Sequence, residues 1–167
     1  MRLLLILFSV FITLNISANG DSTVYKNHVF LETAGTSVFW SLNYERDLGI
    51  VNQFQFKGRV GFSFMNLYDF ERKFNPNLTF PLSLQVLYGK EKHFIEVGAS
   101  FVPSTVSFFN ANTLSKETAL NLSSGGIVGY RFHKKGNRMN YRIFYAPLWE
   151  YFKSYKHWGG ASVGVSF

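Results

Sequence analysis

The chain has 167 residues, enough for one domain, with 47% hydrophobic residues, 19% aromatic residues and no cysteine. The lack of cysteine excludes a disulfide framework, a thiolate metal site and a lipidated N-terminal cysteine. The formal net charge of +7 invites a nucleic-acid interpretation. We reject it because the basic residues fall at the ends and on one face of predicted strands, and because the chain carries an export signal.

The first 20 residues have the pattern of a secretory signal peptide. Arg2 provides the positive start, Leu3–Leu14 the apolar run, and residues 18–20 a small-x-small cleavage site. A membrane anchor is the alternative, but this apolar run is too short for one. We therefore expect cleavage before Asp21, leaving a mature domain of residues 21–167 whose net charge is +6 after the loss of one arginine.

Eight segments of the mature chain alternate apolar and polar residues with a period of two, the pattern of strands with one apolar face. The clearest is Phe54–Met65, in which Phe54, Phe56, Val60, Phe62 and Phe64 alternate with polar residues. A strand that crosses a bilayer at a tilt needs roughly 9–11 residues, and this segment is long enough. The eight predicted strands cover residues 28–35, 38–45, 54–65, 80–89, 95–101, 120–132, 139–145 and 158–167.

The predicted connections after even-numbered strands are all short, and three of the four after odd-numbered strands are long. Short turns are expected at residues 35–37, at Asp47-Leu48-Gly49, at residues 89–92 and at residues 133–137, and long connections at residues 66–79, 103–119 and 147–157. Transmembrane barrels have short periplasmic turns and longer external loops in this alternation. The sequence therefore predicts an all-β protein, an eight-stranded antiparallel up-and-down transmembrane β-barrel.

Aromatic residues on the apolar face fall into two sets. At the short-turn end these are Tyr44, Phe54, Tyr88, Phe132, Tyr141 and Phe167, and at the long-connection end Trp40, Phe64, Phe80, Phe101 and Tyr145. Between them lies an aliphatic band of Leu42, Val60, Leu84, Val86, Val97, Ile143 and Val163. Two girdles separated by such a band are typical of two membrane interfaces, whereas the alternative is a soluble protein with an aromatic core.

Five segments carry a resemblance to a known family. SLNYER (41–46), TFPLSL (79–84), GYRF (129–132), FYAPLW (144–149) and WGGASVGVSF (158–167) resemble small outer-membrane β-barrel proteins of Gram-negative bacteria, of the OmpX or OmpA membrane-domain type. The resemblance covers the chain from about Val29 to its end. It implies a monomer in the outer membrane, in contact with lipid and lipopolysaccharide, with its C-terminus in the periplasm. Val163, Val165 and Phe167 resemble the signal that the barrel-assembly machinery recognises.

The chemistry of the chain points to no catalytic, cofactor or metal site. His157, Glu150 and Ser154 could be written as a hydrolase triad, and lipid A-modifying barrels keep catalytic groups near the external leaflet. These three residues share one predicted connection with no rigid strand to hold them. A lipid A-modifying enzyme and a lipocalin-like carrier, with apolar residues inside the barrel, stay as alternatives to a non-enzymatic barrel.

The inward face is predicted to carry a network of charges: Glu32, Glu45, Lys57, Arg59, Glu96, Arg131 and Arg142. Short-turn register places Glu45 beside Lys57 and Arg59, and Gln85 opposite Glu96. Glu96 can meet Arg131, and Arg142 can reach toward Glu32. Because an eight-stranded barrel has room inside only for side chains, these charges should be paired and should close the lumen.

The connection at residues 147–157 interleaves aromatic residues with lysines, which suits a surface where lipid chains meet phosphates. We expect it to contact lipopolysaccharide or a surface partner through Trp149, Tyr151, Phe152, Lys153, Tyr155 and Lys156. The alternative is that these side chains pack over the mouth of the barrel.

Overall fold

The computed structural model describes residues 25–37, 39–64, 76–110, 114–133, 137–150 and 154–167. The predicted signal peptide at residues 1–20 lies outside these ranges. Among the described residues, no helix has the length and apolar character needed to cross a membrane.

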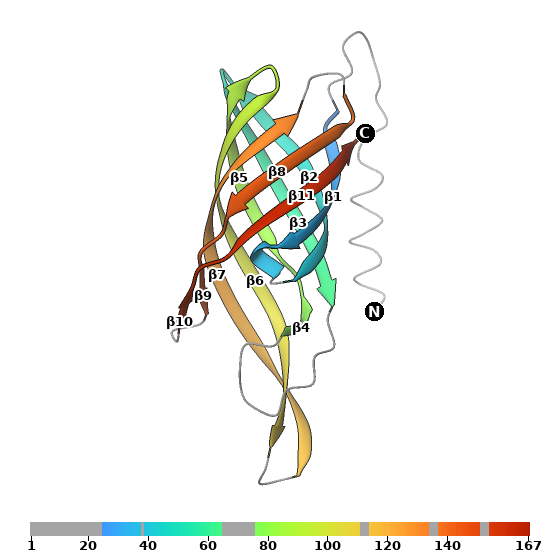
Figure 1. Cartoon of the computed structure of the whole chain (residues 1–167), viewed down its shortest axis with the longest axis vertical. Coiled ribbons are helices and arrows are strands. Elements are labelled where there is room, and N and C mark those ends of the chain that lie inside the picture. Colours follow the sequence, from blue (N-terminus) through green and yellow to red (C-terminus); the bar gives the residue numbers. More distant parts are fainter. Residues whose placement is uncertain (1–24, 38, 65–75, 111–113, 134–136, 151–153) are drawn as a thin grey trace.

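The strands close into an eight-stranded antiparallel barrel, as predicted (Figure 1). Its wall runs β1-β2-β3-β5-β6-β7-β8-β11 and returns to β1. Short strands lengthen this wall: β4 pairs with β3 and β6, β9 with β7, and β10 with β9. The elements are β1 (Asn27–Ala34), η1 (Gly35–Ser37), β2 (Trp40–Val51), β3 (Phe54–Phe64), β4 (Pro76–Thr79), β5 (Leu82–Lys90), β6 (His93–Asn110), β7 (Ser115–His133), β8 (Met139–Tyr145), β9 (Leu148–Glu150), β10 (Ser154–Lys156) and β11 (Gly159–Ser166).

The apolar face of the strands points outward and the polar face points into the barrel. On β3, Phe54, Val60 and Phe64 are exposed, whereas Lys57 and Arg59 are buried. The residues of both predicted girdles and of the aliphatic band are exposed or half-buried on the outer surface. This arrangement contradicts the lipocalin-like alternative, which requires an apolar interior.

The turn predicted at Asp47-Leu48-Gly49 is wrong. β2 continues to Val51, and its register with β3 shifts between Asp47 and Gly49. The chain turns instead at residues 52–53, where Asn52 has a φ of 57°, a conformation that asparagine tolerates. A β-bulge absorbs one extra residue without ending the strand, so an Asp-Leu-Gly sequence need not be a turn.

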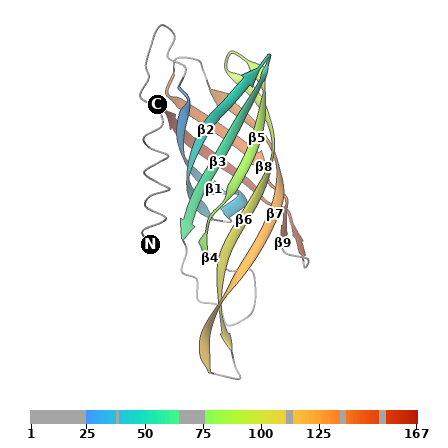
Figure 2. The same cartoon turned by 180° about the vertical axis from the view of Figure 1, so that it is seen from behind.

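The long connection predicted at residues 103–119 is also wrong, because most of it belongs to one extended hairpin. β6 and β7 pair from His93↔Phe132 to Asn110↔Ser115, and the far end of the hairpin projects beyond the barrel (Figure 2). From the sequence, Pro103 was expected to end the strand. Its carbonyl accepts a hydrogen bond from the Phe80 N–H at 2.9 Å, which shows that this side of Pro103 faces the gap between β4 and β5. The backbone N–H that proline lacks would point to the same gap, so its absence removes no hydrogen bond between paired strands. The connection predicted at residues 66–79 likewise ends in β4, and its residues 66–75 are outside the description.

The connection between β1 and β2 folds toward the barrel interior. Gly35, Thr36 and Ser37 form η1 and are all buried. η1 approaches β2 and β11 and also β6, which lies across the barrel from β1 (Figure 1). A side chain in place of Gly35 would collide with the Phe144 ring, so glycine permits this close approach. The turn therefore occupies part of the lumen.

Candidate functional site

The structure brings the seven predicted lumen residues together inside the barrel. They come from β1, β2, β3, β6, β7 and β8, and strand alternation places each on an inward position. All seven side chains are buried: Glu32, Glu45, Lys57, Arg59, Glu96, Arg131 and Arg142.

Six of these residues form a closed ring, called the charge ring below, in which three glutamates alternate with three arginines. Each member contacts two neighbours of opposite charge, so the formal charges of the ring cancel. The contacts are Glu32 Oε2–Arg59 Nη1 at 3.1 Å, Arg59 Nη2–Glu45 Oε2 at 2.6 Å, Glu45 Oε1–Arg131 Nη1 at 2.5 Å, Arg131 Nη2–Glu96 Oε2 at 2.7 Å, Glu96 Oε1–Arg142 Nη2 at 2.6 Å and Arg142 Nη1–Glu32 Oε2 at 3.0 Å.

Most contacts of the charge ring are also hydrogen bonds. Arg131 donates to both oxygens of Glu45 and to Glu96, the forked geometry that makes guanidinium–carboxylate pairs strong. Nη2 of Arg142 is close to Glu96 but lacks the angle of a hydrogen bond, whereas its Nε donates to the same oxygen at 2.8 Å. The desolvation cost of the buried charges is therefore offset by specific partners.

The charge ring crosses the full width of the barrel. β2 and β7 are on opposite sides of the barrel, and the Glu45–Arg131 pair joins them.

One predicted detail of the register between β5 and β6 is wrong: Glu96 lies opposite Leu87, while Gln85 lies opposite Gly98. The short-turn register was misjudged by two residues, which keeps the face of each side chain and changes its height in the barrel.

Two inward-facing phenylalanines cover the charge ring. The guanidinium carbons of Arg59 and Arg131 lie 4.8 and 5.3 Å from the centre of the Phe30 ring, and that of Arg142 lies 3.7 Å from the centre of Phe144. These distances are those of cation–π contacts. Neither aromatic was predicted to have a role, although Phe30 alternates with Leu31 and Phe144 with Ile143, which marks both as inward.

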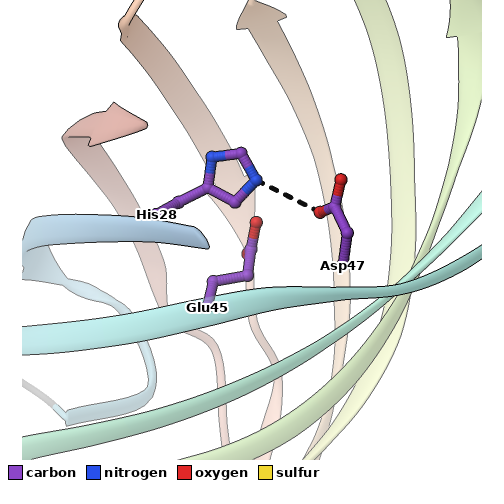
Figure 3. Close-up of side chains that lie close together, drawn as sticks. All are labelled: His28, Glu45 and Asp47. Atoms are coloured by element: carbon purple, nitrogen blue, oxygen red, sulfur yellow. Dashed lines mark hydrogen bonds and ion pairs between the residues drawn. The ribbon is translucent and has the colours of Figure 1, made fainter. Parts of the chain in front are cut away.

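A second polar cluster lies near the short-turn end of the lumen, and Figure 3 shows its His28 and Asp47 beside Glu45 of the charge ring. His28 Nε2 is 3.1 Å from Asp47 Oδ1, and His28 Nδ1 is 2.7 Å from the hydroxyl of Ser166. Asn140 Nδ2 donates to the same hydroxyl at 2.9 Å. Ser166 thus joins side chains from β1, β8 and β11 at the seam where the first and last strands of the barrel meet.

This second cluster has the donor types of a metal site but already contains a cation. Ligand atoms of His28, Glu45 and Asp47 all lie within 4.8 Å of one another. The ammonium of Lys57 bonds to the Asp47 carboxylate, is 3.8 Å from a Glu45 oxygen and lies 3.3 Å from His28 Nε2. A metal ion would have to displace this ammonium, so the residues present do not fit one.

The Ser166–His28–Asp47 set does not have the geometry of a working hydrolase. Ser166, His28 and Asp47 are aligned, but Ser166 is 0% exposed, and a substrate carbonyl cannot reach its hydroxyl. In the set considered from the sequence, the His157 ring stacks on Tyr145 and bonds to its hydroxyl. Glu150 of that set accepts a hydrogen bond from Asn121 Nδ2 at 3.2 Å.

The described part of the predicted external contact loop contains two short paired strands, β9 and β10. Trp149 lies on β9 and Tyr155 and Lys156 on β10, whereas Tyr151, Phe152 and Lys153 fall outside the described residues. The rings of Trp149 and Tyr155 are 5.1 Å apart and both side chains are exposed. Lys156 Nζ is 3.8 Å from a Glu150 oxygen. β9 also pairs with β7, so strand pairing and the alternation of side chains between two faces resume after Pro147.

The three residues of the predicted assembly signal lie on or directly after β11, the last strand of the barrel. Val163 and Val165 are on the outer face of β11, and Phe167 follows it, with exposures of 39%, 44% and 57%. Asn27 and Phe167 exchange two backbone hydrogen bonds, at 3.2 and 2.8 Å, which close the sheet at its end.

Comparisons with known proteins place the fold. No protein-family model matches the chain, and no curated protein matches it. Among solved structures, the N-terminal β-barrel domain of Pseudomonas aeruginosa OprF is similar with a TM-score of 0.52 and 12% identity, over 85% of this chain and 96% of that one. Neisserial surface protein A (NspA) is matched with a TM-score of 0.44 and 12% identity, over 85% and 94%. The chain therefore has the fold of a small eight-stranded β-barrel, the fold of the OprF N-terminal domain.

Proposed function

We propose that this protein is a non-enzymatic outer-membrane β-barrel with a closed lumen and a structural or surface-interaction role. The observation that carries the proposal is the combination of an apolar outer wall with a neutral charge ring across the interior. A water-soluble barrel would not expose Leu42, Leu84 and Ile143 at 52%, 66% and 61% on its wall. Closed barrels are the sheets that satisfy their backbone hydrogen bonds within lipid.

Two layers support a lumen without a through-channel. The charge ring spans the barrel from β2 to β7. On the side of the charge ring that faces the far end of the β6–β7 hairpin, η1 and the apolar side chains of Ile127, Phe144 and Ala146 are buried in the interior. An eight-stranded barrel is just wide enough for its side chains to fill. The buried charges therefore hold opposite walls together and do no catalysis.

The proposed orientation puts the short turns and the C-terminus in the periplasm and the β6–β7 hairpin outside the cell. The hairpin extends past the barrel and exposes Leu114 and Leu120 by 78% and 71%, which favours contact with a surface partner. For lipopolysaccharide, exposed Trp149 and Tyr155 supply an aromatic surface at the same end. Lys156 already faces Glu150, so its charge contributes less to this contact than the sequence suggested.

The proposal is tested by fractionation and by single-channel recording. The protein should sediment with the outer membrane, require detergent for extraction and migrate differently on gels before and after heating. In planar bilayers the folded protein should give no stable conductance, because the charge ring leaves no aqueous path. A folded monomer in detergent-free buffer would contradict the membrane location, and a stable large conductance would contradict the closed lumen.

We also propose that Phe167, with Val163 and Val165, serves as the signal for barrel assembly. Its ring lies on the outer face, where removal leaves the charge ring untouched. Deleting Phe167 should reduce the amount of folded barrel in cells, while refolding of the purified chain in detergent stays close to that of the wild type. Quantitative immunoblotting of outer membranes measures the first effect, and the heat-dependent gel shift measures the second. Unchanged levels in membranes would show that Phe167 is a girdle residue without a role in assembly.

A further inference from the structure

A groove of about 400 Å³ runs across the outer wall over β7, β8, β11 and β1. Its lining forms rows of neighbouring outward residues: Leu31 pairs with Val163 and Val163 with Tyr141, while Thr33 pairs with Ala161 and Ala161 with Ile143. Ala161 and Thr33 are small, so the surface is hollowed between larger side chains. Ligand pockets commonly measure about 300–1,000 Å³, which makes this groove large enough for one chain of a lipid and too small for a whole lipid.

The groove begins at one aromatic girdle and ends in the aliphatic band. Phe132 and Tyr141, which belong to the short-turn girdle, lie in one row with Val163, and Ile143 of the aliphatic band lies in the next row. A flexible hydrocarbon chain that enters at the girdle would therefore lie in the apolar layer along its whole length. This location favours an acyl chain over a polar ligand or a peptide.

Two exposed cations lie beside strand ends on the short-turn side of the groove. The Lys92 carbonyl accepts a hydrogen bond from the His133 N–H at 2.9 Å, which places Lys92 beside the end of β7 next to Phe132. The Arg138 carbonyl accepts one from the Ser166 N–H at 2.8 Å, which places Arg138 beside the end of β11. Both side chains are exposed. Cations at this level attract anionic headgroups.

We propose that the groove binds one acyl chain of an anionic phospholipid from the leaflet at the short-turn end, with its phosphate near Lys92 and Arg138. This inference rests on the proposed membrane function and deepens it by naming a lipid class and its site. Ala161 is the controlling residue, because it forms the hollow and points outward without contacting the charge ring.

Native mass spectrometry of the full chain, released from nanodiscs of equal parts phosphatidylglycerol and phosphatidylcholine, tests the proposal. The wild type should retain one lipid, with phosphatidylglycerol favoured by about fivefold or more, because its headgroup has a net negative charge whereas the choline of phosphatidylcholine balances its phosphate. Ala161→Phe should lower the lipid-bound fraction by about tenfold, the effect of displacing about two CH₂ groups from an apolar surface. Ala161→Leu should give a smaller loss.

Ala99→Phe is the matched control. Ala99 also points outward, but it lies on β6, paired with Leu84 and Gly126, away from the groove. This variant should retain lipid like the wild type. Equal retention by the wild type and Ala161→Phe, equal losses in both phenylalanine variants, or a dimer mass in place of the lipid adduct would overturn the site. The heat-dependent gel shift reports insertion separately, so an inserted barrel without bound lipid refutes the groove and leaves the proposed function intact.

Discussion

Replacing Glu45 with glutamine should lower the free energy of unfolding by about 3–5 kcal/mol, the cost of breaking a buried ion pair from one side. Glu45 is 0% exposed and faces Arg59, Arg131 and Lys57. Glutamine keeps the shape of the side chain but removes the charge that compensates these three cations. Urea unfolding of the refolded protein in lipid vesicles, followed by tryptophan fluorescence, measures the change.

Glu91→Gln is the matched control for this prediction. Glu91 lies in the turn between β5 and β6 and is exposed, so the same chemical change should alter the free energy of unfolding by less than about 0.5 kcal/mol. Adding Arg131→Met to Glu45→Gln should restore part of the loss, because the charge ring is then neutral again, with two glutamates and two arginines. Similar effects for both glutamine variants, or strictly additive effects in the double variant, would show that water screens the charge ring.

Replacing Ser166 with alanine should cost about 1–3 kcal/mol, the penalty for leaving buried polar groups without partners. The Ser166 hydroxyl forms hydrogen bonds with His28 Nδ1 and with the Asn140 amide, and all three residues are buried. Because these residues come from three neighbouring strands, the loss falls on the seam between β11 and β1. The urea midpoint of the folded barrel measures it.

Ser162→Ala provides the comparison, on the same strand and the same inward face. The Ser162 hydroxyl is buried without a hydrogen-bond partner among the residues that the structure describes, so its removal should leave the free energy of unfolding unchanged or raise it slightly. If Ser162→Ala destabilises the barrel as much as Ser166→Ala does, the loss reflects a general effect of mutating β11 and not the contacts of the Ser166 hydroxyl.

The barrel and the direction of its faces could be predicted from the sequence because they depend on period-two patterning. Phe54, Val60 and Phe64 outside and Lys57 and Arg59 inside follow directly from alternation. The same parity marked every member of the charge ring as inward. Parity survives a register error of two residues, which is why Glu96 was assigned to the correct face but to the wrong opposite residue.

Features that depend on distant parts of the chain could not be predicted. Asp47-Leu48-Gly49 is locally indistinguishable from a turn, and the continued pairing of β2 with β3 makes it a bulge. Pro103 is a strand breaker in isolation, and the gap between β4 and β5 makes room for it. The closure of six ion pairs into one ring requires the heights of six residues on six strands, which hairpin registers alone do not provide.

The charge ring makes closure of the sheet and dehydration of the lumen the same event. Glu45 and Arg131 are 86 residues apart in the chain, and Glu32 and Arg142 are 110 apart. An open, partly zipped sheet would hold the two charges of each pair on distant strands, where water must still solvate them. Sequence-distant contacts are costly to form early in folding, and here they become available when β11 meets β1. The last pairing step therefore expels water and joins opposite walls at once, so assembly should end in one cooperative transition.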